Sequence, residues 1–365
     1  KPFIQNIGNF FLKNYHKEYK LVKNMNFLKI NGAHGEGGGQ IVRSAITLSC
    51  ITNQPIHLEN IRKNRKNSGL KPQHLTAIKI LQKITNADVI GAEIGSTELK
   101  FIPRNIESLE LIEDVKTAGS ISLILQVLIP VVSISQKKLS LTIKGGTDVL
   151  WSPSMDYTQY ILKEAYSRMG IKFSIEITNR GYYPKGGGEI KLEVYPAKIK
   201  LVNFFERKTN NIKLICTFSK IPLITIEEEI KKIKEKICKE KNNVEIIIKE
   251  EKAIDSGASL LMYSIDDNSI MGVDTLFNKK TQNFDLNFNK FMNNSLGLDE
   301  KLADMIVVPA SLAEGKTVFR VKEITNHLET NLFVTSKITG CKYGIGKISE
   351  GFEVIIEGVS NSSIK

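Results

Sequence analysis

The chain lacks the features that mark membrane proteins, disulfide-rich proteins and zinc ribbons. No apolar run approaches the roughly 20 residues that a membrane-spanning helix needs. The four cysteines lie far apart and form no Cys-x-x-Cys pair, so neither a disulfide framework nor a zinc ribbon is indicated; they are Cys50, Cys216, Cys238 and Cys341. A His-Glu-x-x-His motif is also missing, and we expect no structural transition-metal site. Cysteines placed in this way are typical of a reducing compartment, and we expect a cytoplasmic protein.

The composition is that of an ordinary globular protein with an excess of positive charge. The 365 residues are 41% apolar and 25% charged, which argues against disorder. At about 150 residues per domain, this length predicts roughly two to three domains, or one large domain with an insertion. The 51 Lys and Arg against 39 Asp and Glu give a formal charge of +12. This sign weakly favours a polyanionic partner, because much of the excess is scattered surface lysine.

Residues 1–25 are predicted to be an N-terminal extension. The segment has no apolar core before a small-residue cleavage site, and it contains neither Arg nor Ser. It therefore resembles neither a secretory signal nor a transit peptide. Met25 is an alternative start of the protein, and no functional expectation depends on it.

From Phe27 onward, the spacing of apolar residues predicts strands and helices in alternation. Apolar positions that recur every three or four residues indicate helices, and short apolar runs indicate strands. The predicted helices cover 41–49, 72–84, 120–132, 157–169 and 299–313, and the predicted strands cover 27–30, 56–61, 99–102, 139–143 and 171–177. Two triple-glycine loops, Gly37–Gly39 and Gly186–Gly188, hint at an internal repeat of one α/β unit.

Residues 205–284 have a different pattern of apolar and charged residues from the rest of the chain. Isoleucines spaced three or four apart between positions 226 and 237 mark one face of an amphipathic helix. Strands are predicted around this helix at 212–218, 244–248 and 260–265. The sequence therefore predicts an α/β protein in which a large domain over 26–204 and 285–357 carries an inserted small α/β domain over 205–284.

The glycine-rich loop Gly35–Gln40 has two interpretations. Bare backbone N–H groups can approach a phosphate closely, with Glu36 free to hold a divalent cation. The structural alternative is a tight strand-to-helix turn that needs positive φ. A dinucleotide fingerprint is rejected because Gln40 stands where its third glycine is needed. A P-loop ending at Thr317 is rejected because Ala310 stands at its first glycine.

The segment Arg62–Lys71 carries five cations and no acid in ten residues. Guanidinium groups suit phosphate oxygens, and Gln73 and His74 follow directly at a predicted helix start. A solvated basic loop is an equally supported alternative. No apolar stripe accompanies the charges, so a phosphate-terminated nucleic acid fits better than a membrane surface.

The sequence around His327 and Asp304 leaves both residues open to two interpretations. A neutral imidazole is a good nucleophile toward phosphorus, and the Thr and Asn that flank His327 are able to fix its tautomer. A lone histidine is more often an ordinary core or surface residue. Asp304 lies in a helix-like stretch, where it either holds a metal or sits on a solvated face.

Several long blocks follow one another in a known order. They are Gly35 to Ser44, Ile61 to Leu75, Gly91 to Ser96, Thr117 to Ser120, Gly145 to Asp148, Arg180 to Gly188, Leu302 to Asp304 and His327 to Asn331. In this order the blocks closely resemble the RNA 3′-terminal phosphate cyclases, in particular those of archaeal type. The resemblance covers about residues 26–357.

The resemblance implies both a fold and a reaction. The implied fold has repeated β-α-β-α-β-β units like those of the C-terminal domain of translation initiation factor 3, with a smaller inserted α/β domain. The implied enzyme consumes ATP, forms a covalent histidine–AMP intermediate and passes AMP to an RNA 3′-phosphate. The ribose 2′-hydroxyl then displaces AMP and leaves a 2′,3′-cyclic phosphate. The implied partners are ATP, a divalent cation (Mg²⁺ or Mn²⁺) and RNA with a 3′-phosphate end; no membrane is involved, and a homodimer is left open.

The same resemblance implies a role for each motif at the site. His327 is the implied nucleophile, and Glu36 and Asp304 are the implied metal ligands. The implied phosphate and RNA ligands are Arg43, Arg62, Arg65, Gln73 and His74. The implied nucleotide-binding residues are Gln126, Lys301, Leu302, Ala303, Asp304 and Met305.

Two positions depart from the bacterial pattern, and two other functions compete. Lys301 and Met305 stand where bacterial relatives have an aromatic residue and a Gln, which leaves the adenine-stacking partner open. One competing function is a non-catalytic RNA-binding relative that acts as a scaffold in ribosome assembly. The other is a carboxyvinyl transferase of a related repeated fold. His327 with Thr330 and Asn331 favours catalysis over the scaffold, and the basic segment favours RNA over small anions.

Overall fold

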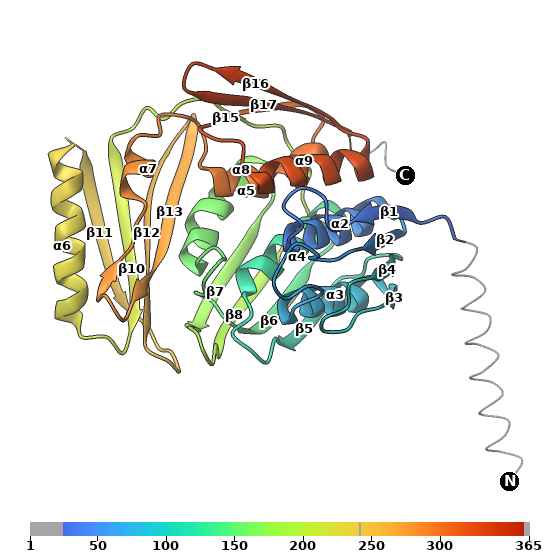
Figure 1. Ribbon diagram of the computed structural model, residues 1–365, viewed down its shortest axis with the longest axis horizontal. Coiled ribbons are helices and arrows are strands. Elements are labelled where there is room, and N and C mark those ends of the chain that lie inside the picture. Colours follow the sequence, from blue (N-terminus) through green and yellow to red (C-terminus); the bar gives the residue numbers. More distant parts are fainter. Residues whose placement is uncertain (1–24, 241, 361–365) are drawn as a thin grey trace, which may run out of the picture.

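The computed structural model describes residues 25–240 and 242–360 and has a mixed α/β architecture (Figure 1). Apart from Met25, the predicted extension over residues 1–25 lies outside the described residues. Within the described part of the chain, none of the helices has the length and apolar character needed to cross a membrane.

Three four-stranded sheets share one connectivity. Their strands are β1 (Leu28–Asn31), β2 (Ile56–Glu59), β3 (Asp88–Ile90), β4 (Leu99–Ile102), β5 (Leu109–Asp114), β6 (Leu139–Gly145), β7 (Phe173–Asn179), β8 (Gly188–Val194), β9 (Asn203–Phe204), β15 (Gly315–Val321), β16 (Lys342–Ile348) and β17 (Gly351–Gly358). In the first sheet β1 and β2 are parallel and the other pairs are antiparallel, in the order β1-β2-β4-β3. The second and third sheets repeat this pattern as β5-β6-β8-β7 and β9-β15-β17-β16.

The helices of these three units form the centre of the molecule. They are α2 (Gly39–Thr52), α3 (Pro72–Thr85), α4 (Ile121–Ile134), the π-helical turn η1 (Tyr157–Leu162), α5 (Lys163–Arg168), α8 (Glu300–Ser311) and α9 (Asn326–Thr339). Most of α4 is buried and apolar, and it packs against α2, α3 and α8. In turn, α9 packs against α2 and α8. Burial of these apolar faces holds the helices side by side between the sheets (Figure 1).

The chain between β9 and α8 forms a five-stranded sheet of its own. Its elements are β10 (Asn211–Ser219), α6 (Leu223–Lys239), β11 (Asn243–Glu250), β12 (Gly257–Asp266), β13 (Ser269–Asn278), β14 (Asn283–Phe284) and α7 (Phe288–Met292). Isoleucines of α6 pack onto this sheet and form a separate cluster of buried residues. In Figure 1 this sheet lies at one end of the molecule, with α6 on its outer side.

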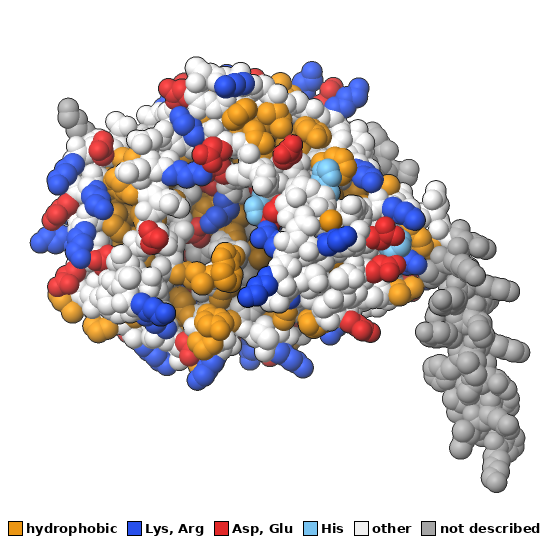
Figure 2. All heavy atoms as spheres, viewed as in Figure 1, with side chains coloured by type: hydrophobic (Ala, Val, Ile, Leu, Met, Phe, Trp, Pro, Cys, Tyr) orange, Lys and Arg blue, Asp and Glu red, His pale blue; other side chains and the backbone are white. Residues whose placement is uncertain are grey.

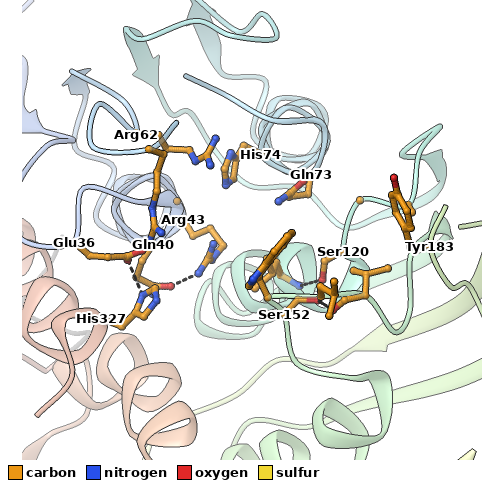
Figure 3. Close-up of a pocket in the computed structure, with 18 residues that line it drawn as sticks. Glu36, Gln40, Arg43, Arg62, Gln73, His74, Ser120, Ser152, Tyr183 and His327 are labelled. Carbon is orange, nitrogen blue, oxygen red and sulfur yellow. Dashed lines mark hydrogen bonds and ion pairs between the residues drawn. The ribbon is translucent and has the colours of Figure 1, made fainter. Parts of the chain in front are cut away.

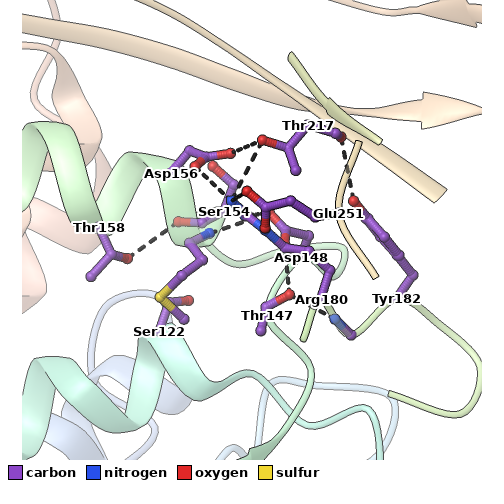
Figure 4. A network of polar contacts seen from close by, with 12 residues as sticks. Ser122, Thr147, Asp148, Ser154, Asp156, Thr158, Arg180, Tyr182, Thr217 and Glu251 are labelled. Carbon is purple, nitrogen blue, oxygen red and sulfur yellow. Dashed lines mark hydrogen bonds and ion pairs between the residues drawn. The ribbon is translucent and has the colours of Figure 1, made fainter. Parts of the chain in front are cut away.

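A buried polar network joins the five-stranded sheet to the second four-stranded sheet (Figure 4). Arg180 follows β7, and its guanidinium lies 2.8 Å from Oδ1 of Asp156 and 3.2 Å from Oδ2 of Asp148. Its Nε lies 2.7 Å from Oε2 of Glu251, which follows β11. Thr217 on β10 donates a 3.0 Å hydrogen bond to Asp156. One arginine therefore neutralises carboxylates from both sides of the junction.

Local pattern predicted some elements better than others. The strand predicted at 99–102 coincides with β4, and the helix predicted at 72–84 lies within α3. The helix predicted over 157–169 begins as the π-helical turn η1 and continues as α5. The helix α9 was not predicted, because its buried face includes Thr330, Asn331 and Thr335 and so lacks a clear apolar period.

Candidate active site

Two adjoining cavities meet at His327. The larger, of about 870 Å³, is lined by the glycine-rich turn and the basic segment; the smaller, of about 470 Å³, lies beside α8. Arg43, Leu123, His327 and the segment 149–152 line both cavities. Figure 3 shows His327 and Glu36 on one side of the larger cavity and Tyr183 on the other. Both volumes fall within the roughly 300–1,000 Å³ typical of small-molecule sites.

The first turns of five helices line these cavities. The lining residues at helix starts are Gly39 and Gln40 of α2, Gln73 and His74 of α3, Ser120 at the N-cap of α4, Glu300 and Lys301 of α8, and His327 of α9. Each helix start presents the positive end of the helix dipole, and in α4, α8 and α9 a side chain caps one of the first N–H groups. The N-cap of α2 is Gly38, which has no side chain to cap those groups. The backbone at these helix starts thus adds positive potential to that of the arginine side chains, an arrangement that suits anions.

Glycines shape the turn that brings Glu36 to His327. Gly35 and Gly37 have φ angles of +54° and +58°, so the expected positive-φ turn is confirmed. The Glu36 N–H donates a 3.2 Å hydrogen bond to Oγ1 of Thr330 on α9. Oε2 of Glu36 then lies 2.8 Å from Nδ1 of His327. A carboxylate at this position keeps the proton on Nδ1 and leaves the lone pair of the neutral ring on Nε2.

The surroundings of His327 favour its neutral form. Burial lowers the pKa of the imidazole, the charge of Asp304 opposes this shift, and nearby arginines including Arg43 add to it. Burial likewise raises the pKa of Asp304, and the neighbouring cations oppose that shift. The flanking Thr325 caps the first turn of α9 with its hydroxyl. The contact to Nδ1 comes instead from Glu36, which lies almost 300 residues earlier in the chain.

Three arginines, Arg43, Arg62 and Arg65, line the larger cavity and are called its cationic wall. A buried chain of hydrogen bonds between α2, α9 and α8 fixes the first of them. Arg43 donates to the side chain of Gln40, which donates to Oγ of Ser44 over 3.2 Å. Ser44 donates to Oδ1 of Asn331 over 2.6 Å, and Asn331 donates to the backbone carbonyl of Asp304 over 2.7 Å. Burial lowers the pKa of Arg43 to about 10, so its guanidinium stays charged at neutral pH. The chain holds this cation where the two cavities meet.

His74 is a neutral hydrogen-bond donor in the same wall. Its Nδ1 accepts a 3.2 Å hydrogen bond from the Lys71 N–H, so the proton of the neutral ring lies on Nε2. Burial lowers the pKa of His74 to about 3, and the neighbouring cations lower it further. Arg62 donates to two backbone carbonyls of its own segment and also lines the larger cavity, as do Arg65 and Gln73. All five predicted phosphate ligands are thus brought together around one cavity.

The predicted nucleotide-binding residues separate into two groups. The side chains that line the smaller cavity are Gln126, Lys301, Asp304 and Met305. Leu302 and Ala303 are fully buried in the hydrophobic core and line neither cavity. The structure places these two in the core because they lie on the face of α8 that packs inward.

Lys301 is held by a local network at the smaller cavity. Its ammonium pairs with Asp274 and lies 4.8 Å from the centre of the Tyr157 ring. Asp274 also accepts a 2.6 Å hydrogen bond from the backbone N–H of Ser154. Lys301 therefore presents a cation and an aliphatic stem to the cavity where bacterial relatives are expected to present a ring.

Several lining residues were missed from the sequence. They include Leu150, Trp151, Tyr183 and Asp274. Trp151 and Tyr183 adjoin or fall within motif blocks, and their aromatic side chains were the signal available. Asp274 had no such signal, because the predicted strands of its segment ended at 265.

Glu36 and Asp304 have the donor atoms that a divalent cation needs. Both carboxylate oxygens of Glu36 and Oδ1 of Asp304 are buried without a hydrogen-bond partner, although Glu36 also pairs with Arg65 and His327. Among the described residues, no three or more His, Cys, Asp or Glu side chains are grouped to hold a metal by themselves. Mg²⁺ often binds through one or two carboxylates together with substrate phosphates. Glu36 lines the larger cavity and Asp304 the smaller one, so each offers a carboxylate oxygen to a metal that arrives with a nucleotide.

These features define a mixed α/β protein in which arginines, five helix starts and one histidine surround two adjoining cavities. The sequence model of the RNA 3′-terminal phosphate cyclase family matches residues 34–345. The chain therefore belongs to the RNA 3′-terminal phosphate cyclase family, which is a family of enzymes, and the expected resemblance is confirmed.

Relatives named RNA 3′-terminal phosphate cyclase match most of the chain. The protein of Methanosarcina barkeri is 36% identical over 90% of this chain and 99% of its own length. Those of Pyrobaculum aerophilum and Pyrococcus abyssi are 32% and 36% identical over 91% and 86% of this chain, and over 98% and 93% of their own lengths. A solved EPSP synthase from Acinetobacter baumannii covers 92% of this chain, and 66% of that structure is matched, at 10% identity. Its TM-score of 0.28 supports no conclusion.

Proposed function

We propose that this protein uses ATP to convert an RNA 3′-terminal phosphate into a 2′,3′-cyclic phosphate, with His327 as the nucleophile. The main support is the position of His327, where a cavity lined by arginines meets a cavity beside α8. One cavity suits the RNA end and the other suits the nucleotide. Membership of the cyclase family supports the same reaction.

In the first step, Nε2 of His327 attacks the α-phosphorus of ATP. A P–N bond forms, the bond from the α-phosphorus to the bridging oxygen breaks, and pyrophosphate leaves. Glu36 stabilises the charge that develops on the imidazole through its contact with Nδ1. Arg43 and the helix starts stabilise the negative charge on the transferring group.

In the second step, an oxygen of the RNA 3′-phosphate attacks the α-phosphorus of the His327 adduct. The P–N bond breaks, so the ring is restored and the RNA end carries AMP through a phosphoanhydride. The ribose 2′-hydroxyl then attacks the RNA phosphorus, loses its proton and expels AMP. Splitting the reaction in this way replaces a poor leaving group by AMP. Arg62, Arg65 and His74 hold the RNA phosphate during both displacements.

Glu36 and Asp304 are the residues that would hold a divalent cation. Such an ion neutralises phosphate charge when it is bound. Gln126, Lys301 and Met305 would line the bound nucleoside. The inserted domain over 205–284, the likeness to the translation initiation factor domain, the homodimer and the cytoplasmic location stay predictions.

The test follows transfer of label from ATP to protein. Full-length protein is incubated with ATP labelled at the α-phosphate, and acid-labile label on the protein is measured. We expect label on the wild type and on His57→Gln, whose ring lies beside Glu98 and lines neither cavity, and none on His327→Ala. Addition of RNA with a 3′-phosphate should discharge the label and yield a cyclic end. A folded wild-type protein that takes up no label would favour the non-catalytic RNA-binding alternative.

A further inference from the structure

Two exposed aromatic rings line the larger cavity together with the arginines. Trp151, the only tryptophan of the chain, is 95% exposed, and Tyr183 is 74% exposed. In the close-up, Tyr183 lies across the cavity from Arg62 and His74 (Figure 3). The space-filling view shows hydrophobic side chains beside lysine and arginine side chains at the central depression (Figure 2). Rings so exposed gain nothing from burial in the protein itself.

The loop that carries Trp151 is fixed on both sides. Ser152 donates a 2.9 Å hydrogen bond to the carbonyl of Val149, and Ser122 of α4 donates a 2.7 Å hydrogen bond to the carbonyl of Pro153. Trp151 itself has φ +61°, a conformation that is unfavourable for a bulky side chain. The hydrogen bonds of the loop thus keep the indole in solvent, although the positive φ of Trp151 strains the backbone.

The turn that carries Tyr183 is also held in place. The Lys185 N–H donates a 2.9 Å hydrogen bond to Asp255, and the Gly186 N–H donates a 2.8 Å hydrogen bond to the Tyr182 carbonyl. Tyr182 is buried and its hydroxyl donates to the carbonyl of Thr217. Of two consecutive tyrosines, one therefore anchors the turn and the other faces the cavity.

We propose that Trp151 and Tyr183 form a platform on which the terminal bases of the RNA stack while the arginines grip its 3′-phosphate. Unstacked bases of single-stranded RNA are commonly bound by aromatic faces, and every base offers such a face. The platform thus positions any RNA end without selecting its sequence. Tyr183 lines only the larger cavity, whereas Trp151 stands where the two cavities meet. The position of Tyr183 is the observation that favours RNA over the nucleoside of ATP as the occupant of the platform. The inference rests on the proposed function and adds a subsite for the bases.

The fluorescence of Trp151 reports the platform directly, since it is the chain's only indole. A short RNA with a 3′-phosphate, added to the full-length protein without ATP, should quench the emission in a saturable manner. Inorganic phosphate and an oligonucleotide whose last two nucleotides lack bases should leave the emission unchanged. Quenching by ATP and not by RNA would overturn the proposal.

Kinetics supply the second test. Each variant is first loaded with AMP, so that only the RNA-dependent steps are measured. Trp151→Ala should raise the KM for RNA about 5- to 100-fold, and Trp151→Phe, which keeps a ring, should recover most of the loss. Tyr183→Ala should also raise the KM. Tyr343→Ala on β16, an exposed tyrosine that lines neither cavity, is the matched control and should behave as the wild type.

The base-free oligonucleotide separates stacking from a merely structural role of the loop. With it, Trp151→Ala and the wild type should have the same KM, because there is no base to stack. A loss in Trp151→Ala that persists with this substrate, or no loss with normal RNA, would overturn the platform. Wild-type protein that takes up no AMP would instead contradict the proposed function, so the two failures are distinguishable.

Discussion

Glu36 and His327 lie almost 300 residues apart in the chain, yet Oε2 of one is 2.8 Å from Nδ1 of the other. The contact requires the positive φ angles of Gly35 and Gly37 and the position of α9 against α2. It places a negative charge beside Nδ1 of His327, which favours a proton on that nitrogen. The carboxylate is therefore a positioning group for the proposed nucleophile as well as a candidate metal ligand.

Glu36→Gln should slow transfer of AMP from ATP to the protein by about 10²- to 10⁴-fold. The amide keeps the shape of the side chain but does not stabilise the charge that develops on His327. Rapid-quench measurement of labelled protein in a single turnover checks this expectation. Glu93→Gln, at an exposed glutamate that lines neither cavity, is the control and should keep the wild-type rate. A Glu36→Gln rate within a few-fold of the wild type would contradict the role assigned to the contact.

The buried His74 should make the protein less stable in acid. Its pKa is about 3 in the folded protein against 6.5 as the ordinary value, so between these pH values the unfolded state binds the extra proton. The free energy of unfolding should therefore fall as the pH falls from 6.5, with His74 contributing up to about 1.4 kcal/mol per pH unit. Urea unfolding of wild type and His74→Gln between pH 7 and 5 measures this contribution. Equal pH slopes in the two proteins would refute it.

Salt should weaken RNA binding, and Arg62→Gln should reduce that dependence. Each phosphate contact that is lost lowers the slope of log affinity against log salt concentration by about 0.7 for a single strand. Arg62 lines the larger cavity, whereas Arg104 pairs with Asp88 and lines neither cavity. Binding titrations of a 3′-phosphorylated RNA at several salt concentrations should show a smaller slope for Arg62→Gln and an unchanged slope for Arg104→Gln. The same slope in all three proteins would argue against a phosphate contact at Arg62.

Arg180→Met should destabilise the junction shown in Figure 4. The substitution leaves Asp148 and Asp156 buried without their cation, which should cost about 3–5 kcal/mol of unfolding free energy. Lys213→Met removes an exposed pair with Glu245 and should cost about 1 kcal/mol or less. Chemical denaturation of both variants gives the comparison. Similar losses of unfolding free energy in the two variants would show that Arg180 does not stabilise the junction between the two sheets.

Much of the site was predictable because its residues occur in recognisable blocks. The charge and spacing of Arg62–Lys71, Gln73 and His74 left phosphate binding and a solvated loop equally supported, and the resemblance to the cyclases favoured phosphate binding. The start of α3 at Pro72 followed from proline's preference for the first turn of a helix. Strand β4 followed from its apolar run.

Other features depend on which side chains are buried, and these were decided by the tertiary structure. Leu302 and Ala303 stand in the same block as Asp304 but pack into the core. Trp151 is left in solvent although its type would favour burial. His74 has a low pKa only because the fold buries its ring beside several cations.

The sequence by itself determined the family, the basic segment and the start of α3, because propensity, charge and motif order are properties of neighbouring residues. Only the tertiary structure decided that Glu36 meets His327, that five helix starts share one site, and that Trp151 lines the same cavity as the arginines. These are relations through space between segments that are distant in the chain. They arise when burial of apolar helix faces brings α2, α4, α8 and α9 together, and no local pattern specifies them.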